Sequence, residues 1–443
     1  MPIGFAGWEI YPCNIACSAL EVDASRCHDN LRKDAKRLFV SDEEDIDLNV
    51  LQFPCESGDQ DDQQPPPFPH YIQSTLDLES YLSNPSDISV FQISQDDSWS
   101  PLLITEELFR KLCTALRVHP DFLQIVHTFG EKTAATEESL AASFTRLYPP
   151  TFSCDYEIAY NFKYVARHGR GAVLKDPFSI RQIGVYHRSA GKSGKSAWIL
   201  LHVPEALSER LSIAIGECDG SKPLDQFRLH ALMLSHLSED WRAYIGYLED
   251  SFTDLMDRSF SSSGNQEPAE GGITVEFADI RSLQILTDRL KCLYHLLRLN
   301  ISLKERLDAF FVCVKASLAP DDASMQYETM MQNYGQQTQI NISRIELLID
   351  RAKGVSLLTE HILNVRNANT NYKMNLAIHD LSKQGVEENI IMRQLAAHTT
   401  KDTKTMRAFG LVAVVFLPAT FLASRHFLDP IFSDSKARNM VTV

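Results

Sequence analysis

One apolar run restricts the fold of this chain more than any other feature. It extends from Ala408 to Ser424 and contains no charged residue. Its 17 residues fall at the lower limit of the roughly 17–25 residues that a membrane-spanning helix needs. Arg407 and Arg425 border the run, and long cationic side chains at helix ends can reach the membrane surface. We therefore expect a transmembrane helix over residues 405–428.

The alternative is that the same run forms the buried core helix of a soluble protein. Only a short polar tail, residues 429–443, follows the run, so no downstream element is expected to cover a helix that is apolar all round. Gly410 and Pro418 are tolerated in membrane helices. The position of the run therefore favours a lipid bilayer as its partner. Four Lys or Arg residues lie shortly before the run and three lie after it. Because positively charged residues are more frequent on the cytoplasmic side of a membrane helix, this difference of one favours a cytoplasmic location for the N-terminal side. The upstream set is Arg393, Lys401, Lys404 and Arg407, and the downstream set is Arg425, Lys436 and Arg438.

The amino-acid composition indicates which kind of partner is unlikely for this chain and which cellular compartment suits its cysteines. The formal net charge is −15, and this acidic balance argues against a nucleic-acid partner, whose footprint is basic. The nine cysteines are odd in number and irregularly spaced, which indicates free thiols in a reducing compartment. The group Cys13, Cys17, Cys27 and His28 offers zinc-ligand chemistry, but its spacing fits no standard zinc module. We expect free cysteines there. The N-terminus lacks a basic region typical of a signal peptide.

The first half of the chain predicts a loosely ordered segment followed by a mixed α/β domain. Residues 1–70 carry an acidic run and a proline-rich stretch, which are typical of loose order. Residues 71–222 contain a helix capped by Thr105, a short helix closed by Gly130 and candidate strands at 90–94, 156–164, 179–187 and 196–203. The strand over 156–164 alternates apolar and polar residues and predicts one buried face. The strand over 196–203 is apolar throughout and predicts a central position in its sheet.

The second half predicts long helices that pack lengthwise. Heptad spacing favours this arrangement, and we expect a coiled stalk over residues 223–404, with a break near Gly385. Asn300 interrupts the second heptad series and is a candidate for fixing the register. The two series are Phe227, Leu234, Trp241, Leu248 and Leu255, and then Leu286, Leu293, Asn300, Leu307 and Val314.

No set of residues predicts an enzyme. The stretch "SAGKSGKS" (189–196) ends like a phosphate-binding loop, but Ser189 replaces the first glycine and a strand is expected to follow. A hairpin loop is the favoured interpretation, and a soluble nucleotide-binding protein is the alternative. His230 and His236 are six residues apart, so they do not share a helix face as zinc ligands do.

At residues 400–424 the sequence resembles the CorA superfamily of divalent-metal channels, especially its divergent fungal branch. The shared pattern is Asp402, then Met406-Arg407, then Phe416-Leu417-Pro418-Ala419-Thr420-Phe421. "DPFSIRQIGVYH" (176–187) and Trp241-x-x-Tyr244 are similar to features of that branch. The resemblance covers about residues 75–425 and implies an α+β cytoplasmic domain, a long α-helical stalk and one C-terminal transmembrane helix.

The resemblance implies a homo-oligomer, a pentamer, that conducts Mg²⁺ or a related divalent cation and needs no other cofactor. It also implies a single- or multi-pass membrane protein whose N-terminal part is cytoplasmic. The family's Gly-Met-Asn filter falls on Phe427, Leu428 and Asp429, so only a carboxylate remains at the filter position. The family's second membrane helix has no counterpart in residues 429–443, which suggests a lost helix or an incomplete gene prediction. The implied pore-lining residues are Met406, Phe409, Ala413, Leu417, Thr420 and Ser424.

Two pairs of carboxylates are candidates for binding a regulatory cation. Asp321-Asp322 lies at a predicted turn, and Glu387-Glu388 lies on the stalk. Adjacent carboxylates repel each other, and a divalent cation removes that repulsion. Solvated helix-end carboxylates are the simpler interpretation. The absent filter also leaves a second function open, that of a non-conducting single-pass helical scaffold.

Overall fold

The computed structural model of the protein describes residues 5–15, 18, 21–51, 69–83, 86–132, 140–148, 155–168, 176–190, 195–217, 223–262, 274–316 and 322–433. Two compact units divide the chain. The first contains residues 1–262 and 273–360, and the second contains residues 263–272 and 361–443. The helix α9 contributes its beginning to the first unit and its remainder to the second.

The elements follow one another in an order that mixes strands and helices before the long helices begin. They are η1 (Trp8–Ile10), α1 (Ala24–Leu38), β1 (Phe39–Val40), η2 (Glu43–Asp45), β2 (Leu48–Leu51), β3 (Pro69–Ile72), α2 (Thr75–Ser83), β4 (Ile88–Ile93), β5 (Leu102–Thr105), α3 (Glu106–Ala115), α4 (Phe122–Val126), β6 (Ser143–Leu147), β7 (Tyr156–Arg167), β8 (Phe178–Ala190), β9 (Lys195–Leu201), α5 (Glu205–Gly216), α6 (Pro223–His236), α7 (Trp241–Ser261), α8 (Phe277–Lys315) and α9 (Asp322–Ser433).

A seven-stranded sheet forms the centre of the first unit, in the order β3-β2-β4-β9-β8-β7-β6. β4 and β9 are parallel, and every other neighbouring pair is antiparallel. The apolar strand β9 lies in the middle, which confirms its predicted central position. Its pairing with β8 places Ala190 opposite Lys195, so the "SAGKSGKS" stretch joins two antiparallel strands. Residues 191–194 lie outside the described part of the chain.

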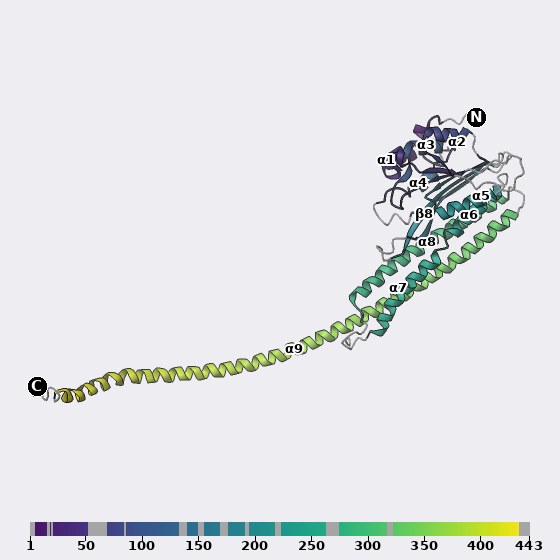
Figure 1. The fold of residues 1–443 in the computed structure, drawn as a ribbon. Coiled ribbons are helices and arrows are strands. Elements are labelled where there is room, and N and C mark those ends of the chain that lie inside the picture. The colour runs from purple at the N-terminus through teal and green to yellow at the C-terminus, as the bar shows by residue number, and fades with distance from the viewer. Residues whose placement is uncertain are drawn as a thin grey trace, which may run out of the picture. The chain divides into compact units, whose positions relative to one another are not determined.

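Helices cover both faces of this sheet (Figure 1). Alternation along the strands sends Trp198 and Leu200 of β9 into a core shared with α5, α6, α8 and the beginning of α9. Ile199 and Leu201 point the other way, into a core shared with α1, α2, α3 and α4. The first unit is therefore a helix–sheet–helix sandwich, with a third core formed by α7, α8 and α9.

The structure corrects the prediction that β7 has one solvated face. Glu157, Asn161 and Lys163 alternate with apolar residues as predicted, yet each is at most 5% exposed. The reason is that helices and loops cover the second face as well, and long-range partners satisfy the polar groups. The Asn161 side chain donates to the carbonyl of Leu140 at 3.0 Å, and Lys163 Nζ donates to Gln182 Oε1 at 3.1 Å.

The N-terminal region also differs from the composition-based expectation of loose order. Within residues 1–70 the structure contains η1, α1, β1, η2, β2 and the first two residues of β3. Leu31 and Leu38 of α1 and Leu48 and Val50 of β2 are buried in the core that faces α3 and α4. These apolar positions recur at helix and strand spacing, which a count of acidic and proline residues does not detect. Residues 52–68, with the proline-rich stretch, lie outside the described residues.

The second heptad series lies within one helix, α8, as predicted. The first series does not lie within one helix. The first heptad series is divided between α6 and α7, because the helix is interrupted between His236 and Trp241. Phe227 therefore joins the sheet core, whereas Trp241 and Leu248 join the core of α7, α8 and α9. α9 continues without interruption through Gly385, so the predicted break is absent.

Candidate functional site

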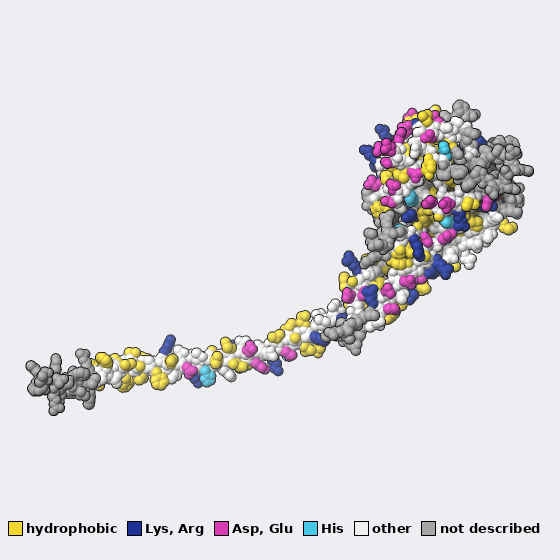
Figure 2. Space-filling model, viewed as in Figure 1, with side chains coloured by type: hydrophobic (Ala, Val, Ile, Leu, Met, Phe, Trp, Pro, Cys, Tyr) yellow, Lys and Arg dark blue, Asp and Glu magenta, His cyan; other side chains and the backbone are white. Residues whose placement is uncertain are grey.

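The apolar end of α9 is exposed on all sides within this chain. Phe409, Val414 and Leu417 are 70%, 70% and 64% exposed. Among the described residues, Ser324–Ser424 is the one helical stretch long and apolar enough to cross a membrane, and none of its most apolar window is buried. Figure 2 shows hydrophobic side chains along this end, ahead of the grey terminus. Such exposure differs from a soluble core helix, whose apolar residues are covered.

The six predicted pore-lining residues occupy one stripe of α9, and all six are exposed. Thr420 Oγ1 donates to the carbonyl of Phe416 at 2.9 Å, and Ser424 Oγ donates to that of Phe421 at 3.0 Å. Each hydroxyl is thus satisfied within the helix and needs no water partner, which suits a helix in an apolar surrounding. Their oxygen lone pairs remain available to a hydrated ion. The stripe contains Met406, Phe409, Ala413, Leu417, Thr420 and Ser424.

The predicted cation ligands are described only in part. Glu387 and Glu388 are exposed on α9. Asp322 begins α9 and Asp429 lies near its end, but their side chains lie outside the described part, as does the whole of Asp321. Over the described residues, no group of three or more His, Cys, Asp or Glu side chains is placed to hold a metal ion.

Among the described residues, Cys13, Cys27 and His28 belong to no group of three or more side chains placed to hold a metal ion. His28 Nδ1 lies 3.0 Å from the carbonyl oxygen of Tyr11 and 3.2 Å from the Arg110 guanidinium. Burial and the carboxylates of Asp121 and Asp23 raise the pKa of Cys27, which disfavours the thiolate that a metal requires. Cys17 lies outside the described residues. The five described cysteines, Cys13, Cys27, Cys113, Cys292 and Cys313, form no disulfide.

The two sequence features of the first unit, the 176–187 stretch and Trp241-x-x-Tyr244, meet at Asp176. Its Oδ2 accepts a hydrogen bond from the Tyr244 hydroxyl at 3.1 Å and forms an ion pair with Arg289, while its Oδ1 accepts from the backbone N–H of Phe178 at 3.0 Å. The rings of Phe178 and Tyr244 pack with centroids 4.8 Å apart. This Asp176 cluster joins the beginning of β8 to α7 and α8. Sequence reasoning identified Asp176 and Tyr244 but gave no signal for Arg289, which lies on α8 far away in the sequence.

A groove of about 840 Å³ opens beside the Asp176 cluster. Asp97 and Trp99, which follow β4, and His202, which follows β9, line it. Both strands are parallel, so the groove lies at their carboxyl ends, where open α/β sheets commonly bind ligands. His202 has a φ of 56°, and burial together with Arg181 lowers its pKa to about 4. The imidazole is therefore neutral at pH 7, and the groove combines neutral, acidic and basic side chains.

A chain of buried polar groups connects the sheet to α6. Tyr160 Oη lies 2.9 Å from His230 Nδ1, His230 Nε2 lies 3.0 Å from His187 Nδ1, and His187 Nε2 lies 2.8 Å from Gln226 Oε1. Both histidines are fully buried, and the His187 ring stacks on Trp198 at 3.7 Å. Burial lowers the pKa of His230 to about 3 and that of His187 well below its usual value.

The hydrogen-bond directions in this chain are consistent with two neutral rings. If His187 Nε2–H donates to Gln226 Oε1, then His187 Nδ1 accepts from His230 Nε2–H, and His230 Nδ1 accepts from Tyr160. Every polar atom is then paired without a charge, so the arrangement stabilises the core rather than exchanging protons. Sequence reasoning compared His230 with His236 and missed His187. The available signal was a histidine at an apolar strand position, next to Tyr186.

Known proteins similar to this chain include a sequence family and solved structures. The sequence model of a family described as CorA-like transporters matches residues 4–260. No curated protein sequence matches. Among solved structures, "structure of the full-length CmaX protein" matches with 11% identity and a TM-score of 0.36, over 75% of this chain and 80% of that one.

Proposed function

Because the chain belongs to the CorA-like transporter family, we propose that it carries Mg²⁺ or a related divalent cation across a membrane as a homo-oligomeric channel. The observation that carries the proposal is the family match over residues 4–260, which includes the whole seven-stranded sheet. The exposed apolar end of α9 supports it, because that end supplies a helix able to enter a bilayer. In the proposed orientation the sheet lies in the cytoplasm.

The pore of this channel is proposed to be the stripe from Met406 to Ser424. In a symmetric ring of copies, one face of each membrane helix meets the axis, and positions three and four apart share that face. The proposed stripe is mainly apolar with two hydroxyls. Mg²⁺ loses its water reluctantly, so such a wall suits a cation that passes hydrated. Asp429 is proposed to supply the carboxylate at the filter position. The motif residues Asp176 to His187 support a place in the fungal branch of the family.

Metal uptake tests the proposal. The full-length chain is reconstituted into liposomes that contain a Mg²⁺-sensitive dye, and the initial rate of dye response is measured. Ala413→Trp places a bulky ring on the proposed stripe, and we expect it to reduce uptake at least tenfold. Val415→Trp is the matched control, because two residues along a helix turn a side chain by roughly 200°. We expect it to leave the rate within twofold of the parent.

Two outcomes contradict the proposal. If the parent chain conducts no Mg²⁺, Co²⁺ or Ni²⁺ although carbonate washing leaves it in the membrane, it is not a channel for these cations. If carbonate releases the protein from membranes, the end of α9 is not a spanning helix.

The alternative function is a non-conducting, membrane-anchored scaffold. The observation in its favour is the departure from the family's filter at Phe427, Leu428 and Asp429. A scaffold predicts carbonate-resistant membrane association with no uptake in either tryptophan variant or the parent. Restored growth of a magnesium-uptake mutant by this chain argues against it.

A further inference from the structure

Three basic residues lie on one side of α9 directly before its apolar end. They are Lys401, Lys404 and Arg407, and all three are exposed. Residues three apart on an α-helix are neighbours on its surface, and each step of three turns the side chain by roughly 60°, so the three side chains share an arc of roughly 120°. We call this surface the basic face of α9.

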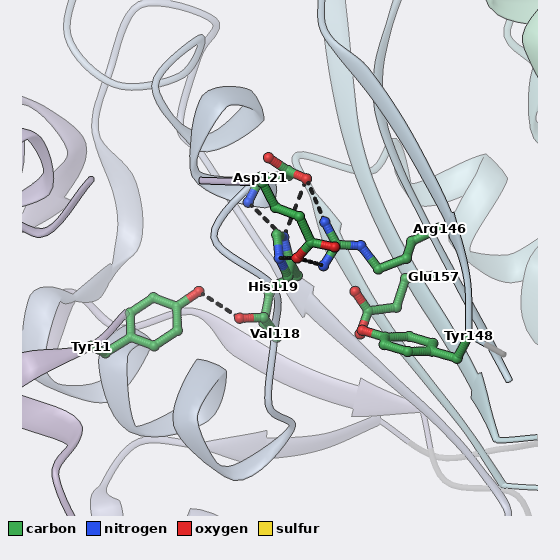
Figure 3. A network of polar contacts seen from close by, with 8 residues as sticks. Tyr11, Val118, His119, Asp121, Arg146, Tyr148 and Glu157 are labelled. Carbon is green, nitrogen blue, oxygen red and sulfur yellow. Dashed lines mark hydrogen bonds and ion pairs between the residues drawn. The ribbon is translucent and has the colours of Figure 1, made fainter. Parts of the chain in front are cut away.

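No carboxylate of α9 is placed to pair with the basic face, as far as the helix is described. Partners along a helix lie three or four positions away, and none of those positions around the three cations holds Asp or Glu. Asp402 follows Lys401 directly but lies roughly 160° round the helix from Lys404. By contrast, Arg146 of the first unit is paired, with its Nη2 3.2 Å from Asp121 Oδ2 (Figure 3). The cations of the basic face instead repel one another, and a bound anion would remove that repulsion.

The basic face lies opposite the proposed pore stripe. Counted from Lys404 at roughly 100° per residue, all six residues of the stripe lie between roughly 140° and 220° round the helix. If the stripe of each copy faces the axis of the proposed ring, the basic face points outward, toward the surrounding lipid. This step rests on the proposed function.

The basic face also lies at the level of the membrane surface. Arg407 directly precedes the apolar run, and Lys401 lies about 9 Å before Arg407 along the helix axis. The polar headgroup layer on each side of a bilayer is roughly 5–7 Å deep, and long basic side chains extend their charged ends toward it. In the proposed orientation this layer belongs to the cytoplasmic leaflet, whose anionic lipids give it a negative surface potential.

We propose that the basic face binds the headgroups of anionic phospholipids in the cytoplasmic leaflet. Ammonium and guanidinium groups form charge-assisted hydrogen bonds with phosphate and carboxylate oxygens. The lipid supplies the anions that α9 lacks at these positions. It also fixes the rotation of α9 about its own axis, because the opposite side of the helix, with the stripe, is then turned away from the lipid.

Lipid selectivity of the full chain tests this inference. The chain is reconstituted into phosphatidylcholine vesicles that contain a trace of spin-labelled phosphatidylserine or of spin-labelled phosphatidylcholine. The electron paramagnetic resonance spectrum gives the fraction of each label that the protein immobilises. We expect the parent to prefer phosphatidylserine at least twofold, and we expect the preference to vanish when Lys401, Lys404 and Arg407 are all replaced by Gln. Salt should weaken the preference in the parent, because it screens exposed charges.

The matched control replaces Lys373, Lys383 and Arg393 by Gln. It removes three positive charges from the same helix, but all three lie about 20 Å or more before Arg407 along the axis. We expect this variant to keep the preference of the parent. If both triple variants lose the preference equally, net charge rather than the basic face is responsible, and the inference is overturned.

Further outcomes separate this inference from the channel proposal. Equal affinity of the parent for the two lipids overturns the inference if carbonate leaves the chain in the membrane, whether or not the chain conducts Mg²⁺. If the triple variant of the basic face then also dissociates the oligomer, the face binds carboxylates of a neighbouring copy instead. A lipid preference in a chain that conducts no cation supports the inference and contradicts the channel alone. Extraction of the parent by carbonate overturns both.

Discussion

At the scale of single residues, buried polar groups in this protein depend on partners that are distant in the sequence. Asn300 illustrates this. Its place in the heptad series predicts a residue that fixes helix register, but its Nδ2 donates to the carbonyl of Lys163 on β7 at 2.9 Å. The amide thus joins α8 to the sheet. The burial of Asn300 follows from its seam position, whereas its partner depends on a fold that brings residues 163 and 300 together.

The buried histidines predict a loss of stability in mild acid. The usual histidine pKa is about 6.5, and the folded-state pKa values of His187 and His230 lie far below it. Below pH 6.5 the unfolded chain binds protons that the folded chain refuses, so unfolding becomes easier as the pH falls. Each histidine contributes a loss of up to about 1.4 kcal/mol per pH unit. We expect the melting temperature to fall between pH 6.5 and 5, before most carboxylates titrate.

The variant His230→Gln tests this origin of the acid sensitivity. Glutamine retains hydrogen-bonding groups near Tyr160 and His187 but does not titrate, so the slope of melting temperature against pH over this window becomes shallower. His379→Gln is the control, because His379 is exposed on α9, with 78% of its side chain accessible. An unchanged slope for His230→Gln, or a flat profile for the parent, contradicts the prediction.

At the scale of elements, a local sequence pattern predicted the position or the boundary of an element correctly where that pattern alone determines it. The apolar strand β9 is central as predicted, and Thr105 Oγ1 caps α3 by accepting from the N–H of Leu108 at 3.3 Å. The interruption between α6 and α7 was missed, because the heptad spacing continues through it while the two helices serve different cores. Register between helices is a tertiary property that a repeat alone does not contain.

Gly385 gives a prediction at this scale, because α9 is continuous there. A β-carbon added at Gly385 meets no atom within 4 Å, and glycine within a helix costs roughly 1 kcal/mol relative to alanine. We expect Gly385→Ala to slow amide hydrogen exchange around residue 385 several-fold and to leave membrane association unchanged. Gly354→Ala is the control, since it is also helical with open space around it. Faster exchange in Gly385→Ala indicates a hinge that needs glycine.

At the scale of the whole molecule, the motif that resembles the CorA superfamily and the region that the family model matches lie in different parts of the chain. The resemblance was strongest at residues 400–424, whereas the family match covers residues 4–260 and so includes residues 4–70. The shared helix face of the six proposed pore-lining residues was predictable, because a single helix fixes the spacing of its side chains, whereas their role stays a prediction. The Asp176 cluster was predictable only in part, since Arg289 reaches Asp176 through packing of α8 that no local pattern encodes.

The acidic pairs give a prediction for the assembled protein. We propose that a divalent cation bridges Asp321-Asp322 or Glu387-Glu388 of neighbouring copies, so that Mg²⁺ stabilises the folded assembly by mass action. The melting temperature of the parent should rise by a few degrees in Mg²⁺, and replacement of the four carboxylates by Asn or Gln should at least halve that rise. The control neutralises Glu43, Glu44, Asp96 and Asp97, which changes the net charge equally. Identical Mg²⁺ responses in all three proteins rule out these pairs as the binding sites.

The parallel pairing of β4 with β9 also has a consequence for folding during translation. β4 ends at residue 93 and its partner β9 ends at residue 201, and synthesis proceeds at about 5–20 residues per second. The interval between synthesis of β4, whose residues are all buried in the folded protein, and synthesis of its neighbour β9 is therefore roughly 5–20 s. During that interval the apolar side chains and the open edge of β4 are accessible to other chains. This exposure of β4 comes well before the apolar end of α9 is synthesised.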